Sequence, residues 1–289
     1  SRSVVSSLLK LGVGFTISKI CNYAALVGDN FIVGRVMGAA PLGLYSRAYQ
    51  IMTLPATYVG QVMEKVLFPA FAKKQNDKER VAFVYLLGIE CIGLLALPMS
   101  VFCYLASKEI VEVLLGGKWT EAVSVLEILS LGMYFRTAYK NSDTLITGLG
   151  AVYQHSARQF IYTVLVLVGA YFGTYWGLCG VSWAVLFAVV MNFVLMSQLS
   201  HKLLNLSIKP FLRTHLPGLW ISFWLAIVLS LVTIAMRAYA LNVFVCLAIQ
   251  VVVSAIVCAV SAILSRGAFR PTFFDWSLKY LNLQSFGPI

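Results

Sequence analysis

The fold is decided by residues 19–50, which read KICNYAALVGDNFIVGRVMGAAPLGLYSRAYQ. This stretch is apolar enough to lie in a bilayer, yet it carries several polar side chains: Lys19, Asn22, Asp29, Arg35 and Arg47. Lys19, Asn22 and Asp29 follow steps of three and four, so they share one face of a helix. An ionisable side chain at membrane depth costs about 2.5–3.5 kcal/mol on insertion scales, so such residues face a protein interior or a water-filled cavity. We therefore expect a cavity whose walls come from the rest of the chain.

The composition indicates a membrane protein built from helices. Of the 289 residues, 60% are hydrophobic and 11% are charged, whereas a soluble domain has about 25% charged residues. The apolar runs are long and continuous, without the alternation that is typical of outer-membrane strands. The sequence predicts an all-α polytopic membrane protein.

Eight apolar segments are long enough to cross a hydrocarbon core of about 30 Å, which takes about 20 helical residues. They are 9–34, 42–68, 81–106, 122–147, 152–174, 178–199, 214–236 and 242–265. Several connections contain only a few residues, so consecutive helices are expected to be antiparallel. We predict an eight-helix transmembrane bundle followed by a cytoplasmic or interfacial tail, 267–289.

The net charge of +11 would suggest a nucleic-acid partner in a soluble protein. Here we interpret it through the positive-inside rule, with no nucleic-acid partner. If Ser1 is cytoplasmic and the helices alternate, the inside segments carry Arg2, Lys10, Lys73, Lys74, Lys78, Arg80, Arg158, Lys202, Lys209, Arg213, Arg266, Arg270 and Lys279. The outside segments carry only Arg35, Lys108, Lys118 and Arg237. This bias predicts that both termini are cytoplasmic.

The segment 122–147 is a second polar helix. Arg136, Lys140, Asp143 and Thr147 recur at helical spacing and form one broad hydrophilic face. One interpretation is an internal salt-bridge ladder, with Lys140 paired to Asp143 and Arg136 paired to a carboxylate elsewhere. The other is that the face lines a hydrated pathway.

Eight ionisable residues lie well inside the predicted helices, and five of them are basic: Lys19, Asp29, Arg47, Glu90, Arg136, Lys140, Asp143 and Arg158. If they share a cavity, its net charge is positive and favours an anionic ligand. Arg158 can instead extend to the cytoplasmic headgroups. The candidate substrate-binding residues are Lys19, Asn22, Asp29, Arg47, Arg136, Lys140 and Asp143.

A group of tyrosines falls on three of these helices: Tyr23, Tyr45, Tyr49, Tyr134 and Tyr139. Tyrosine at the ends of membrane helices is normally an interfacial anchor. The alternative is that these rings stack on sugars.

No enzyme motif is present in the sequence. There is no phosphate-binding glycine loop, no GxSxG and no HExxH, and the six cysteines and three histidines are scattered. We therefore predict a protein that is not an enzyme, with no catalytic residue, no cofactor and no metal site.

Three blocks of sequence, at 15–55, 66–80 and 114–156, closely resemble the polysaccharide flippases of the MOP exporter superfamily. Examples are FTISKICNYAALVGDNFIVGRVMGAAPLG and MYFRTAYKNSDTLITGLGAVYQHS. The most similar type is that of colanic-acid or lipopolysaccharide biosynthesis. The resemblance implies a two-lobed bundle of fourteen helices, in which residues 1–205 are the second lobe and residues 206–266 are the last helix pair. It also implies a missing N-terminal lobe of six helices.

By the same resemblance, the function is the flipping of undecaprenyl-pyrophosphate-linked oligosaccharide across the bacterial inner membrane by alternating access, for exopolysaccharide or lipopolysaccharide biosynthesis. The implied partners are the lipid-linked oligosaccharide, membrane lipids, the missing lobe and a polysaccharide polymerase or export machinery. Related proteins use an ion gradient, so a coupling ion, H⁺ or Na⁺, is expected at Asp29 or Asp143.

Three alternatives stay open from the sequence. A multidrug or organic-cation antiporter of the same superfamily would need an acidic cavity. A membrane polymerase or ligase would need catalytic residues in a large outside loop, which the sequence lacks. An inactive scaffold fragment of the export machinery would have lost the transport function.

Overall fold

The structure is a computed structural model that describes residues 2–73, 77–238 and 241–269, and these residues form helices and short connections without a strand. The long helices are α1 (Arg2–Met37), α2 (Ala39–Lys73), α3 (Lys78–Leu105), α5 (Ala122–Gly148), α6 (Val152–Gly173), α7 (Gly177–Leu204), α9 (Leu216–Ala238) and α10 (Val243–Phe269). The short elements are α4 (Ser107–Leu114), η1 (Gly117–Trp119), η2 (Thr174–Trp176) and α8 (Ile208–Arg213). The predicted all-α fold is confirmed.

The long helices lie where the apolar segments predicted them, with two differences. First, α1 and α2 extend beyond 9–34 and 42–68 at both ends, because the helix continues past the apolar segment. Second, the connection between the predicted segments 81–106 and 122–147 contains α4, whose apolar side chains Ile110 and Val111 are buried in the bundle. The sequence pattern did not resolve this one short amphipathic helix.

Four segments of the described chain are long and apolar enough to cross a membrane: Lys78–Leu105, Val152–Leu204, Ile208–Met236 and Val243–Leu264. The second of these contains both α6 and α7. The helices α1, α2 and α5 carry more charged residues, which agrees with their place around the cavity described below. The number of membrane crossings stays a prediction.

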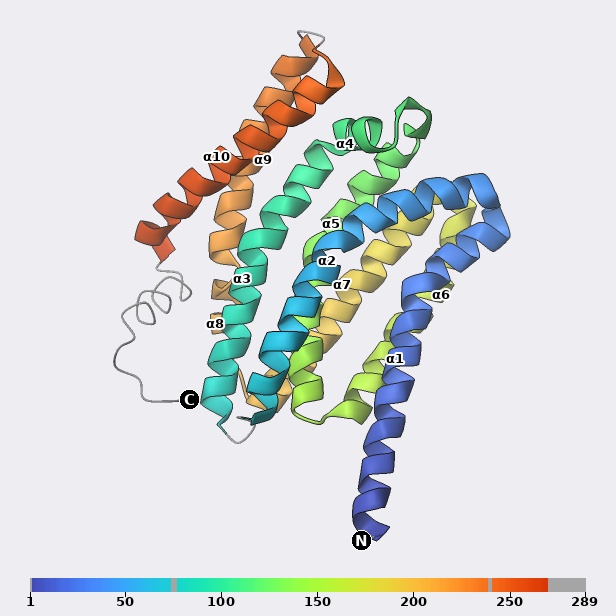
Figure 1. Ribbon diagram of the computed structural model, residues 1–289, viewed down its shortest axis with the longest axis vertical. Helices are drawn as coiled ribbons and strands as arrows, with labels where there is room; N and C mark the ends of the chain where they lie inside the picture. Colours follow the sequence, from blue (N-terminus) through green and yellow to red (C-terminus); the bar gives the residue numbers. More distant parts are fainter. Residues whose placement is uncertain (1, 74–76, 239–240, 270–289) are drawn as a thin grey trace.

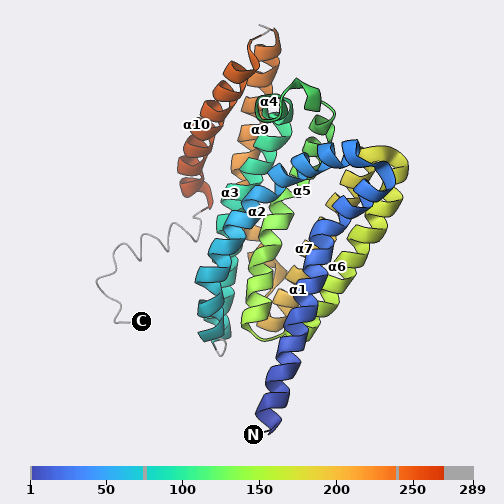
Figure 2. The same ribbon diagram turned by 45° about the vertical axis from the view of Figure 1, so that its right-hand side comes forward.

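The helices around this cavity form two walls. In Figures 1 and 2, α1 lies along α6, while α2 lies along α5. The two walls are joined on one side by α7, which packs on both α5 and α6. At the edge of the bundle away from α1, α9 packs on α3, and α10 packs on α9 and α4. The walls therefore diverge from the corner where α1 meets α2.

That corner is a single residue, Gly38, between the last residue of α1 and the first of α2. Gly38 has φ +96°, a backbone conformation that costs a residue with a side chain about 1–2 kcal/mol. Leu42 on α2 packs against Gly34 on α1, where an added Cβ would lie only 2.9 Å from the leucine Cδ2. Glycine at both positions lets two long helices reverse direction within one residue.

The basic segments lie at a common end of the bundle. The N-terminal end of α1, the C-terminal end of α2, the N-terminal end of α3, the α5–α6 turn and the end of α7 point the same way in Figure 1, opposite to the Gly38 corner. This grouping is the one that the distribution of Lys and Arg predicted. The predicted tail 267–289 falls almost wholly on 270–289, which lie outside the described residues.

Candidate functional site

A cavity of about 690 Å³ opens between the two walls. It is lined by four helices, α1, α2, α5 and α6, and its lining residues are Phe15, Ser18, Lys19, Asn22, Tyr23, Leu26, Thr53, Ala56, Thr57, Gly60, Gln61, Phe68, Arg136, Tyr139, Lys140, Asp143, Thr144, Thr147 and His155. Three of them are basic and one is acidic. With His155 neutral, the lining carries an excess of two positive charges.

Five of the seven candidate binding residues lie in the cavity lining: Lys19, Asn22, Arg136, Lys140 and Asp143. Their contact with a substrate stays a prediction. The other two, Asp29 and Arg47, do not line the cavity, and this placement corrects our expectation. Asp29 shares a helix face with Asn22, but there α2 already covers α1, and the carboxylate is fully buried against Tyr45. Arg47 is exposed and donates to Gln50 Oε1 at 3.3 Å.

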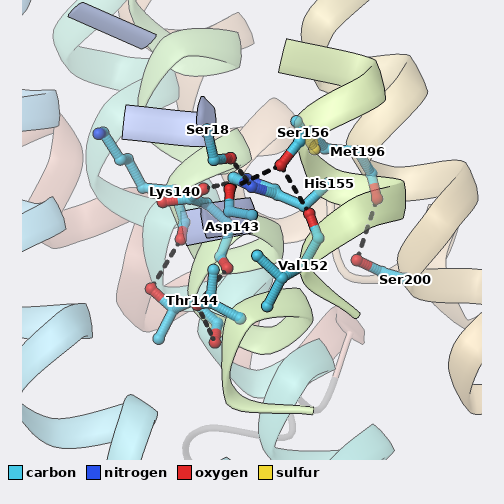
Figure 3. Close-up of polar contacts among 11 residues, drawn as sticks. Ser18, Lys140, Asp143, Thr144, Val152, His155, Ser156, Met196 and Ser200 are labelled. Atoms are coloured by element: carbon cyan, nitrogen blue, oxygen red, sulfur yellow. Dashed lines mark hydrogen bonds and ion pairs between the residues drawn. The ribbon is translucent and has the colours of Figure 1, made fainter. Parts of the chain in front are cut away.

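Asp143 is paired with a residue that the sequence interpretation missed. His155, from the first turn of α6, places Nε2 at 2.5 Å from Asp143 Oδ1, and its Nδ1 contacts the Ser18 hydroxyl of α1 (Figure 3). An ionised carboxylate accepts only, so Nε2–H donates to Asp143 and Nδ1 accepts from Ser18 when the imidazole is neutral. This Ser18–His155–Asp143 chain connects α1 and α6 with α5, across the two walls.

The predicted Lys140–Asp143 bridge is wrong. No ion pair joins these two side chains among the described residues; Asp143 is instead hydrogen-bonded to His155. The Lys140 stem packs on α2, where a Cβ on Gly60 would lie 3.4 Å from it, and its ammonium is 5.1 Å from the Tyr139 ring centroid. Lys140 is therefore a cation of the cavity wall and not a step in a salt-bridge ladder.

Arg136 is the most buried cation of the cavity, with 3% of its surface exposed. Its Nη2 donates to the Tyr49 hydroxyl at 2.6 Å, and its guanidinium carbon lies 4.9 Å from the centroid of that ring. The other amino group, Nη1, is buried and has no hydrogen-bond partner in the described structure. No carboxylate of the described residues forms an ion pair with Arg136, so the predicted carboxylate partner is not found there.

The two remaining ionisable residues lie away from the cavity lining. Glu90 is buried in α3, with 2% of its surface exposed. Arg158 donates to the backbone carbonyls of Leu195 on α7, at 3.0 Å, and Gln154 on α6, at 3.2 Å. Neither Glu90 nor Arg158 contributes to the charge of the cavity. Its excess of two positive charges therefore comes from fewer residues than the eight ionisable residues that we expected to share it.

The tyrosines divide into two groups. Tyr23 and Tyr139 line the cavity, but Tyr139 is only 3% exposed and its ring lies beneath the Lys140 ammonium, so Tyr23 is the ring that can contact a sugar. Tyr45, Tyr49 and Tyr134 do not line the cavity and are buried in the protein, each with at most 7% of its surface exposed. Interfacial anchoring is therefore wrong for these three residues.

Comparison with known sequences finds similarity to polysaccharide biosynthesis proteins. Residues 1–124 match the family described as "Polysaccharide biosynthesis protein". The chain is 28% identical over 249 residues to the lipopolysaccharide biosynthesis protein WzxC of Escherichia coli, covering 84% of this chain and 48% of that protein. It is 25% identical to the teichuronic acid biosynthesis protein TuaB of Bacillus subtilis, covering 70% of this chain and 44% of TuaB. The chain thus spans about half the length of these relatives.

Comparison with solved structures identifies the fold. The lipid II flippase MurJ, in an inward closed conformation, superposes with a TM-score of 0.70 at 16% identity, over 93% of this chain and 56% of MurJ. A MOP superfamily transporter from Pyrococcus furiosus gives a TM-score of 0.56 at 18% identity, over 91% of this chain and 65% of that protein. The resemblance predicted from the sequence is confirmed: the chain is a multi-pass membrane protein related to polysaccharide biosynthesis proteins, with the fold of the MOP superfamily transporters.

Proposed function

We propose that this chain forms one lobe of a transporter that flips undecaprenyl-pyrophosphate-linked oligosaccharide across the bacterial inner membrane. The observation that carries the proposal is the buried guanidinium of Arg136, which lines the cavity and lacks a carboxylate partner among the described residues. A buried guanidinium that no carboxylate contacts directly is costly, so its presence at membrane depth points to a ligand that supplies further negative charge. A pyrophosphate group meets this requirement.

The rest of the lining suits the same ligand. Lys19 and Lys140 add two further cations, and ammonium and guanidinium donors pair well with phosphate oxygens. Phe15 and Tyr23 offer ring faces to sugars. A volume of about 690 Å³ is within the range of small-molecule sites, about 300–1,000 Å³. In this proposal the polyprenyl tail stays in the lipid while the headgroup passes through the cavity by alternating access.

The chain spans about half the length of its relatives, and the cavity lies against α1 and α2. We infer that a second, N-terminal lobe of six helices completes the transporter over this face, and that a polysaccharide polymerase or export machinery receives the product. An organic-cation antiporter would need an acidic cavity, whereas this one has an excess of positive charge.

The function is tested by complementation. A strain that lacks its own transporter for such a glycan receives this chain alone, or this chain joined to the lobe encoded with it. Restored surface glycan with the two-lobed protein supports the proposal. Export that stays absent while both proteins reach the membrane would support an inactive scaffold instead.

The orientation has its own test. We expect the end that holds the α2–α3 connection to be cytoplasmic, because Lys and Arg are retained on that side. In a background without natural cysteines, Lys78→Cys should react with an impermeant maleimide only after permeabilisation, since exposed Lys78 begins α3. Trp176→Cys, 75% exposed at the opposite end, should react in intact spheroplasts. The reverse pattern would invert the predicted topology.

We infer further that the coupling ion is a proton carried by the Ser18–His155–Asp143 chain. The two ring nitrogens of a histidine can hold and pass on a proton, and the charged groups of the cavity lining around His155 are Asp143 and Lys140 on α5 and Lys19 on α1. Asp29, the other candidate, is fully buried away from the cavity. Export by the parent should fall when a protonophore collapses the proton gradient, whereas His155→Gln should export slowly and without that response. A parent that responds only to a sodium gradient would contradict the assignment.

A further inference from the structure

A row of four polar side chains is buried behind the cavity and crosses three helices. On α1, Asp29 Oδ2 accepts a hydrogen bond from the Tyr45 hydroxyl at 2.8 Å. On α2, the rings of Tyr45 and Tyr49 lie 5.7 Å apart. On α5, Arg136 donates to the Tyr49 hydroxyl. Of these four residues only Arg136 lines the cavity, so the other three hold it from behind.

The guanidinium is fixed at two points by the same tyrosine. Its Nη2 donates to the hydroxyl, and its guanidinium carbon lies over the ring face. These two contacts restrict the rotation of the long side chain and fix the direction of the planar guanidinium group. A second amino group, Nη1, then has no protein partner in the described structure although the residue is 97% buried, being 3% exposed. Because Arg136 also lines the cavity, this donor without a partner lies just beneath the cavity surface.

Tyr49 is in turn held by its own neighbours. It is 7% exposed and packs against Tyr45, whose hydroxyl is committed to Asp29. Asp29 also accepts from the backbone N–H of Asn30 at 2.7 Å. This support fixes the tyrosine ring, and an anion site benefits when the groups that orient its donors are fixed in this way.

We propose that Tyr49 is the positioning residue for diphosphate recognition: it orients Arg136 so that Nη1 is presented to a phosphate oxygen in the cavity. This inference rests on the proposed function, because it assumes a diphosphate ligand. The inference also assigns different roles to the cations Arg136 and Lys140. Arg136 gives a directed contact, whereas Lys140, whose stem lies on Gly60, gives a flexible point charge.

The test is the affinity of the purified chain for inorganic pyrophosphate and for farnesyl diphosphate, measured by calorimetry in detergent. Tyr49→Phe keeps the ring and removes only the hydroxyl that accepts from Arg136, and it should weaken both ligands about tenfold. Tyr85→Phe is the matched control, because it removes another buried hydroxyl contact, to Ser142 at 2.9 Å, in a different part of the core. It should lower the unfolding temperature as much as Tyr49→Phe and leave both affinities unchanged.

A double-variant cycle distinguishes positioning from a loss of stability. Arg136→Lys keeps the charge but loses the fork, so adding Tyr49→Phe to it should cost no further affinity. If Tyr49→Phe does not yield folded protein, Arg136→Lys alone is the test, and its affinity for both ligands should fall about tenfold. An unchanged affinity in Arg136→Lys or in Tyr49→Phe would overturn the inference. A loss of affinity for farnesyl diphosphate alone would overturn it too. Failure of the parent to bind either ligand would overturn the proposed function and this inference with it.

Discussion

Arg136→Ala is expected to abolish glycan export by the complete two-lobed transporter while the protein still folds. Truncating one partner of a buried charged contact costs about 2–5 kcal/mol of binding, a loss well beyond tenfold. The free protein should lose some stability, because the substitution also removes the hydrogen bond to Tyr49 and truncates a buried side chain, so export is compared at equal amounts of folded protein. The readouts are surface glycan in the complementation strain and the unfolding temperature of the purified protein.

A matched arginine is available as the control. Arg158 also lies on a helix, and it bonds to the carbonyls of Leu195 and Gln154 outside the cavity lining. Arg158→Ala should lower the unfolding temperature and leave export in proportion to the folded protein. If Arg136→Ala exports like the parent, or loses export only through loss of folded protein, the anion site is wrong.

His155→Ala should be the most destabilising single change in the cavity wall, by about 2–4 kcal/mol. It deprives two groups of their partner: the carboxylate of Asp143, 19% exposed, and the hydroxyl of Ser18, 3% exposed. Leaving a buried acceptor unsatisfied costs about 1–3 kcal/mol, and more when that acceptor is charged. Lys140→Ala should change stability far less, because Asp143 keeps its histidine.

The measurement is thermal or chemical unfolding of the four proteins in the cycle formed by His155→Ala and Asp143→Ala. Removing both partners should restore part of the stability that His155→Ala alone has lost, since no unpaired carboxylate remains. Equal losses in Lys140→Ala and His155→Ala would mean that the lysine is the true partner of Asp143 and that the histidine contact is incidental.

Helix positions were predictable from the sequence, because an uninterrupted apolar run of bilayer length has few alternatives to a helix. The wall residues Lys19, Asn22 and Lys140 were predictable for a related reason, since a polar side chain at membrane depth must avoid lipid. Hydropathy does not tell which helix packs against which face of another helix. Asp29 has the right spacing for the cavity face, yet α2 closes over it near the corner, and periodicity along one helix says nothing of where a second helix crosses.

The missed histidine shows the same limit, together with a signal that could have found it. Asp143 and His155 stand on either side of the short α5–α6 turn at 149–151, at comparable distances from it. In an antiparallel pair such positions lie at the same depth. Asp143 was instead assigned to Lys140 because intrahelical spacing is easier to recognise than a pairing between helices.

The single-residue corner at Gly38 has a mechanical consequence for the width of the cavity. Ser18 lies twenty residues from Gly38 along α1, a lever arm of about 30 Å at 1.5 Å per residue. The short α5–α6 turn at 149–151 joins the same two walls near the depth of Ser18 and His155, so the walls cannot swing apart there about Gly38 alone. The hydrogen bond of 2.5 Å between His155 and Asp143 lies close to this second connection. A rigid movement of the two walls is therefore restricted to rotation about the line through the Gly38 corner and the α5–α6 turn, which would open the cavity along its length and not at one end.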